Sequence, residues 1–328
     1  ALSAFITGYE IAAVLGDVAT DGPNFGNRMQ AAGFHPTAVF GKLSAAAAAA
    51  ALLGCDANQA AHALATAATF GGGLTASFGS MAKPLHSGKA AMDGIQAAEL
   101  AKQGLVAARD VFEAPGGFAA AFVQTAPIPF DDVAFTAGAS LADNSFKPYA
   151  CGKLIHGHID AARALRDQCA GRPIKAIRCK APPISARLVG RPLPTTHLEG
   201  KFSIAFCVAA ALAGYPLLPG DFSDDRLADP IVRDLMGKVV VSVDAAMGRY
   251  GSRLDIDLAT GETLSMTVAH SRGNPENPLS WEYLKAKFDG LVEPVLGKDT
   301  DALYDAIRTF EAPGAFGQIL AIVAPGPR

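Results

Sequence analysis

The sequence predicts a mainly α-helical fold in which a large helical domain is interrupted by a smaller α+β insert. Three observations support this expectation. Residues 1–137 carry apolar and alanine-rich patterns at helical spacing, and residues 138–272 contain four segments that alternate valine or isoleucine with polar residues. After Pro275 and Pro278 the chain returns to helical patterns, so residues 273–328 are expected to complete the helical domain.

Four helices are expected in the first domain, over residues 1–15, 38–53, 57–70 and 84–103. Pro36 precedes the second helix and Gly54 follows it, which is the usual asymmetry of helix ends. Asp56 and Gln59 form a capping-box pattern at the start of the third helix. The first helix opens without a capping residue, so we expect the natural upstream helices to be missing from this chain.

The insert combines four expected strands with two helices. The strands are residues 174–180, 238–243, 252–258 and 263–269, and the helices are residues 147–162 and 201–212. Alternation along each strand indicates a sheet with one covered face. Two further helices, over residues 280–291 and 299–310, are expected to belong to the helical domain.

Composition excludes several classes of protein. Half of the 328 residues are hydrophobic and the net charge is only −3, which argues against a disordered chain and against a nucleic-acid partner. The longest nearly apolar stretch, Leu43–Cys55, is too short to span a membrane. The five cysteines contain no CxxC pair, so we expect reduced thiols in a cytoplasmic protein and no zinc or iron–sulfur site.

Two short motifs place chemically versatile side chains at helix starts. His35 occurs in GFHPT, directly before Pro36, where free backbone N–H groups attract anions. Lys83 and His86 occur in KPLHSG, close to the expected start of another helix. Two basic groups at the positive end of a helix suit a carboxylate ligand, and neighbouring positive charge lowers the pKa of a lysine. The structural alternatives are a capping or core histidine at His35, and a surface lysine with a capping neighbour at Lys83.

A third motif, KPYAC, begins at Lys147 and is followed by His156. Pro148 restricts the backbone between Lys147 and Tyr149. Lys147 could bind a carboxylate and Tyr149 could relay a proton, although a lysine alone is more often a solvated surface residue.

Five segments together resemble the MmgE/PrpD family, whose members include 2-methylcitrate dehydratase, cis-aconitate decarboxylase and iminodisuccinate epimerase. The segments occur in the family's order and span nearly the whole chain. They are GFHPTAVFGKLSAAAAAAALLG from Gly33, KPLHSGKAAMDG from Lys83, KPYACGKLIHGHIDA from Lys147, EGKFSIAFCVAAAL from Glu199 and RGNPENPLSWEYLKAKF from Arg272.

The resemblance implies a large all-helical domain interrupted by a smaller α+β lid domain, with the active site between them. It also implies a homodimer and chemistry without a metal or cofactor. By motif match, it assigns His35, Lys83 and Lys147 to catalytic positions. It places His86, Tyr149 and His156 in the same motifs, and we expect these three residues to bind substrate.

The chain differs from the decarboxylase-type members at two positions. Phe206 stands where those members carry a tyrosine, and Gly152 stands where they carry a histidine. Both differences argue against decarboxylation. The expected function is therefore a metal-independent lyase that removes a proton next to a carboxylate of a small di- or tricarboxylic acid and eliminates water. An epimerase of a small dicarboxylate is the first alternative, and a truncated, inactive binding subunit is the second.

Overall fold

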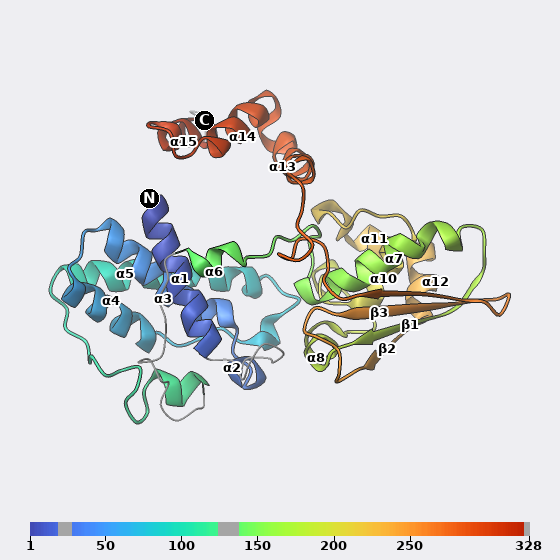
Figure 1. The fold of residues 1–328 in the computed structure, drawn as a ribbon, viewed down its shortest axis with the longest axis horizontal. Helices are drawn as coiled ribbons and strands as arrows, with labels where there is room; N and C mark the ends of the chain where they lie inside the picture. Colours follow the sequence, from blue (N-terminus) through green and yellow to red (C-terminus); the bar gives the residue numbers. More distant parts are fainter. Residues whose placement is uncertain (19–27, 124–137, 325–328) are drawn as a thin grey trace.

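The computed structural model describes residues 1–18, 28–123 and 138–324, and it is mainly helical with one four-stranded sheet (Figure 1). The helical class and the small sheet are therefore as predicted. In Figure 1 the N-terminal helices gather on one side and the sheet lies on the other. The proposed division into domains 1–137, 138–272 and 273–328 stays a prediction, and residue 137 lies outside the described residues.

The N-terminal helices pack around α3, which contacts α1, α4 and α5. Their bounds are α1 Leu2–Val18, α2 Arg28–Ala31, α3 Pro36–Leu52, α4 Ala57–Thr69 and α5 Ala82–Lys102. Helices α3 and α5 cross closely, since a Cβ added at Gly94 would lie 2.5 Å from the Cβ of Ala45. The small side chains of the alanine run in α3 allow this close approach. The predicted capping box of α4 is confirmed, with reciprocal hydrogen bonds between Asp56 and Gln59.

The sheet has the strand order β2-β1-β3-β4, in which only the β1–β2 pair is parallel. The strands are β1 Ile174–Ala181, β2 Val239–Val243, β3 Ser252–Leu258 and β4 Thr263–Val268. Helix α7 (His156–Cys169) packs against β3 and β4, and α10 (Ile204–Leu212) packs against α7 and β2. Every residue of α10 is buried, so this helix forms the centre of the core beside the sheet.

The three C-terminal helices pack on one another, α13 against α14 and α14 against α15. They are α13 Trp281–Leu296, α14 Thr300–Arg308 and α15 Ala315–Val323, and Figure 1 shows them apart from α1–α5. The remaining helices are α6 Ala139–Ala142, α8 Pro183–Val189, α9 His197–Gly200, α11 Asp224–Ala228 and α12 Pro230–Gly237. Among the described residues, no helix combines the length and the apolar character that crossing a membrane requires.

Three of the helix starts that differ from those predicted change the position of a basic residue. Helix α5 begins at Ala82, so Lys83 lies within its first turn and not before it. Helix α7 begins only at His156, which leaves Lys147 on an irregular segment. Helix α10 begins at Ile204 because the Ser203 hydroxyl accepts the backbone N–H of Phe206, so Lys201 lies in the preceding turn.

Candidate active site

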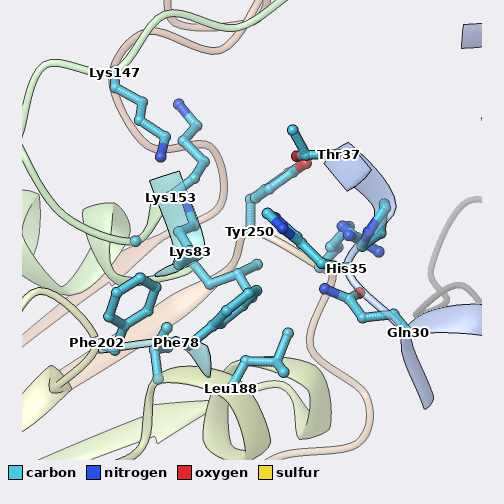
Figure 2. A pocket seen from close by; sticks show the side chains of 15 residues that line it. Gln30, His35, Thr37, Phe78, Lys83, Lys147, Lys153, Leu188, Phe202 and Tyr250 are labelled. Atoms are coloured by element: carbon cyan, nitrogen blue, oxygen red, sulfur yellow. The ribbon is translucent and has the colours of Figure 1, made fainter. Parts of the chain in front are cut away.

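A cavity of about 250 Å³ brings the three predicted catalytic residues together. Figure 2 shows Lys147 on one side of the cavity and His35 on the other. Lys83 lies between them, above the aromatic rings of Phe78 and Phe202. Residues that are far apart in the sequence therefore converge on one cavity.

His35 is held by both its backbone and its ring. It is the N-cap residue of α3, and its backbone N–H donates to the carbonyl of Gly73 at 2.9 Å. Its Nδ1 is 2.9 Å from Nδ1 of His86, and its ring lies edge-on to Phe78. Burial, followed by the nearby charges of Lys83 and His86, lowers the pKa of His35 to about 4. The imidazole is thus uncharged near neutral pH and can accept a proton.

Lys83 is surrounded by aromatic rings and by other ammonium groups. Its Nζ lies 5.8 Å from the centroid of Phe78 and 5.9 Å from that of Phe202. Burial lowers the pKa of Lys83, and the charges of Lys147 and Lys201 lower it further. Like charges this close together favour an anionic ligand between them.

Lys147 is placed by backbone contacts of its own segment. Its Nζ donates to the carbonyl of Cys151 at 3.4 Å, and its carbonyl accepts from Nζ of Lys287, on α13, at 2.6 Å. Among the described residues that line the 250 Å³ cavity there is no aspartate or glutamate. The cavity is therefore strongly basic and has no internal counter-charge from these residues.

The three predicted substrate-binding residues take different places. His86 contacts the ring of His35. Tyr149 is buried, and its hydroxyl donates to Asp160 at 2.6 Å; burial and the Asp160 charge raise the pKa of Tyr149. His156 is fully buried, with its ring 5.1 Å from that of Tyr149. Substrate binding by these residues stays a prediction, and the contacts of Tyr149 and His156 point first to a supporting role.

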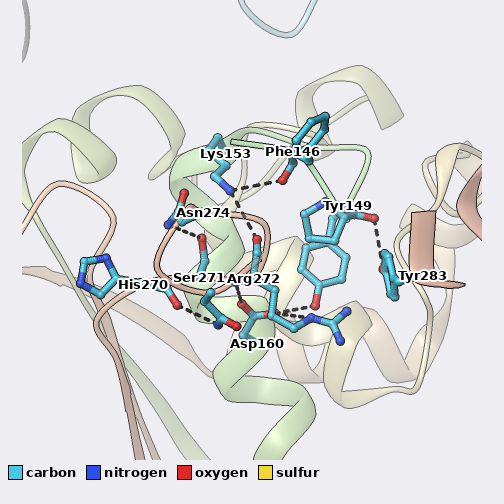
Figure 3. Close-up of polar contacts among 11 residues, drawn as sticks. Phe146, Tyr149, Lys153, Asp160, His270, Ser271, Arg272, Asn274 and Tyr283 are labelled. Atoms are coloured by element: carbon cyan, nitrogen blue, oxygen red, sulfur yellow. Dashed lines mark hydrogen bonds and ion pairs between the residues drawn. The ribbon is translucent and has the colours of Figure 1, made fainter. Parts of the chain in front are cut away.

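Figure 3 shows the network that supports the Lys147 segment. Asp160 accepts the Tyr149 hydroxyl and also the backbone N–H of Arg272, the latter at 2.8 Å. The guanidinium of Arg272 lies 4.7 Å from the ring of Tyr283 on α13. Lys153 donates to the carbonyl of Arg272 at 3.4 Å. This network links α7 to the segment after β4 and to α13.

Two family models match the chain over most of its length. The MmgE/PrpD N-terminal domain matches residues 1–131, and the MmgE/PrpD C-terminal domain matches residues 149–310. The chain belongs to the MmgE/PrpD family. The resemblance seen in the five motifs is therefore confirmed.

Several known members of the MmgE/PrpD family are similar to the chain. Cis-aconitate decarboxylase of Homo sapiens is 28% identical over 291 residues, which are 85% of this chain and 60% of that protein. The cis-aconitate decarboxylase of Aspergillus terreus is 27% identical over 296 residues, 83% of this chain and 60% of that protein. The cis-aconitate decarboxylase-like protein oryM of Aspergillus oryzae is 26% identical over 331 residues, which cover 92% of this chain and 68% of that protein. The chain thus spans about 60% of the length of the human relative.

Sequence reasoning did not single out several residues around this candidate site. Lys153 and Tyr250 line the cavity with His35, and Lys201 lies close enough to Lys83 to influence its pKa. Lys153 and Lys201 are within the quoted motifs, so their basic side chains were a usable signal. Tyr250 precedes β3 in a segment with no recognisable motif, so only the tertiary structure identifies it.

Proposed function

We propose that the chain is a lyase that removes a proton from the carbon next to a carboxylate of a small di- or tricarboxylic acid and eliminates water. The observation that carries this proposal is the presence of an uncharged His35 and the ammonium groups of Lys83 and Lys147 around one cavity. A base beside carboxylate-binding cations is the arrangement that this reaction needs.

Each group has a defined part in the proposed reaction. Lys83 and Lys147 bind carboxylate oxygens, and their fixed positive charge stabilises the enediolate that forms when the C–H bond breaks. His35 accepts that proton, and its hydrogen bond with His86 holds the ring in one orientation. The hydroxyl group on the adjacent carbon then leaves with the proton that His35 holds. Water and an alkene form, and His35 returns to its uncharged state.

Decarboxylation is the second candidate function, because the relatives are named cis-aconitate decarboxylases. Of the two positions that differ from the decarboxylase-type members, Phe206 is fully buried beside Phe222 and does not line the 250 Å³ cavity. Gly152 does line it and has no side chain that could transfer a proton. This difference favours dehydration, in which carbon dioxide is not lost.

The test is to incubate the protein in heavy water with a panel of citrate-like and succinate-like acids and to follow them by NMR. Dehydration predicts an alkene, decarboxylation predicts carbon dioxide, and epimerisation predicts deuterium incorporation with inversion and without an alkene. His35→Gln and Lys147→Gln should each lower the rate about 10²–10⁴-fold, whereas His270→Gln, at an exposed position beside Glu276, should not. Rates within about threefold of wild type for both site variants would reject the assignment, and acid binding without any turnover would indicate a binding subunit.

A further inference from the structure

A second cavity, of about 490 Å³, adjoins the one that contains His35. The two cavities share Lys83, Lys147, Gly152 and Phe202 in their linings. His35 lines only the first cavity, and Lys201 lines only the second. Lys201 therefore lies on the far side of the Lys83–Lys147 pair from the proposed base.

The backbone of Lys201 is held against the Lys147 segment. Its carbonyl accepts the backbone N–H of Gly152 at 2.9 Å, and its Nζ lies 5.4 Å from the ring of Phe222. A Cβ added at Gly152 would lie 3.5 Å from that carbonyl, so the two segments are in close contact. The position of Lys201 relative to Lys147 is thus set by the fold and not by a flexible loop end.

Lys201 has no carboxylate partner among the described residues, and the described lining of the second cavity contains no aspartate or glutamate. Glu199, two residues earlier, is used elsewhere: it pairs with Arg191 and accepts from Thr195. By contrast, Lys153 is hydrogen-bonded to two backbone carbonyls. Three lysines, Lys83, Lys147 and Lys201, therefore line this cavity, and no carboxylate among its described lining residues balances their charge.

A dicarboxylate held by Lys83 and Lys147 would leave the charge of Lys201 unmatched. A third carboxylate on the same ligand would match it and would relieve the repulsion among the three ammonium groups. We propose that Lys201 binds a third carboxylate of the substrate and so makes this site prefer tricarboxylates to dicarboxylates. This inference rests on the proposed function, since it assumes that Lys83 and Lys147 bind the other two carboxylates.

The test measures binding by calorimetry with two acids that have no leaving group. Propane-1,2,3-tricarboxylate and pentanedioate share a carbon chain and differ by the central carboxylate. Wild type should bind the tricarboxylate more tightly. Lys201→Gln should weaken tricarboxylate binding about 10–100-fold and pentanedioate binding less than about threefold, the range expected for one charge-assisted contact. Lys201→Arg should retain most of the preference because it keeps the positive charge.

Controls separate this inference from the proposed function and from misfolding. Lys175→Gln, on an exposed position of β1, removes the same charge away from the site and should leave both affinities unchanged. Thermal unfolding of Lys201→Gln checks that the variant is folded, and Lys201→Met, which also removes the charge, carries the test if it is not. Equal loss of both acids, or no loss of the tricarboxylate, would overturn the role of Lys201. Failure of wild type to bind either acid would instead overturn the proposed function.

Discussion

Removing the carboxylate of Asp160 should destabilise the segment that carries Lys147. One oxygen of Asp160 accepts the hydroxyl of the buried Tyr149, and the other accepts the backbone N–H of Arg272. An Asp160→Ala variant leaves both donors without this acceptor, and each unsatisfied buried group costs about 1–3 kcal/mol. The free energy of unfolding should therefore fall by about 2–6 kcal/mol.

Asp160→Asn gives a graded version of the same experiment. Its amide oxygen can still accept one hydrogen bond, but its amide nitrogen cannot accept the other, so the expected loss is about 1–3 kcal/mol. Urea unfolding followed by circular dichroism measures both variants. Asp167→Ala is the matched control on the same helix, because its side chain is 89% exposed, and it should change stability by less than about 0.5 kcal/mol.

Losses below about 0.5 kcal/mol for both Asp160 variants would refute the assigned role of the network. The same preparations allow a functional readout. If the network positions Lys147, both variants should bind pentanedioate and propane-1,2,3-tricarboxylate more weakly than wild type even at temperatures where they are fully folded. Unchanged affinities would separate the network from the site.

Two further predictions concern stability. Gly94→Ala should lower the free energy of unfolding by more than about 2 kcal/mol, because the new Cβ would lie 2.6 Å from backbone atoms of α3. Gly88→Ala on the same helix has open space and should raise the free energy of unfolding by about 0.5–1 kcal/mol. Similar unfolding midpoints for the two variants would contradict the packing of α3 against α5. Burial lowers the pKa values of His35 and His158 to about 4, below the ordinary value near 6.5. Between these pH values the unfolded chain binds more protons, so the free energy of unfolding should fall with acidification by up to about 1.4 kcal/mol per pH unit for each histidine. A His158→Gln variant measured from pH 7 to pH 4 should show a shallower slope, and a slope equal to that of wild type would exclude a contribution from His158.

Most secondary structure was predictable because the signals act over a few residues. Pro36 and Gly54 bound α3 closely, Asp56 and Gln59 cap α4, and the alternating segments became the four strands. Short helices such as α8 and the final helix α15 were not predicted from the sequence. Their few turns carry too little periodicity to stand out from loops.

The motifs contain basic residues that line one cavity, but they could not establish the contacts among them. The sequence contains His35, Lys83 and Lys147, but it does not show the 2.9 Å distance between Nδ1 of His35 and Nδ1 of His86. It also does not show the second cavity, which Lys201 lines. Helix identity follows from local backbone and side-chain preferences. Distances between residues 50 or more positions apart depend instead on how α3, α5 and the Lys147 segment pack, and only the tertiary structure supplies that packing.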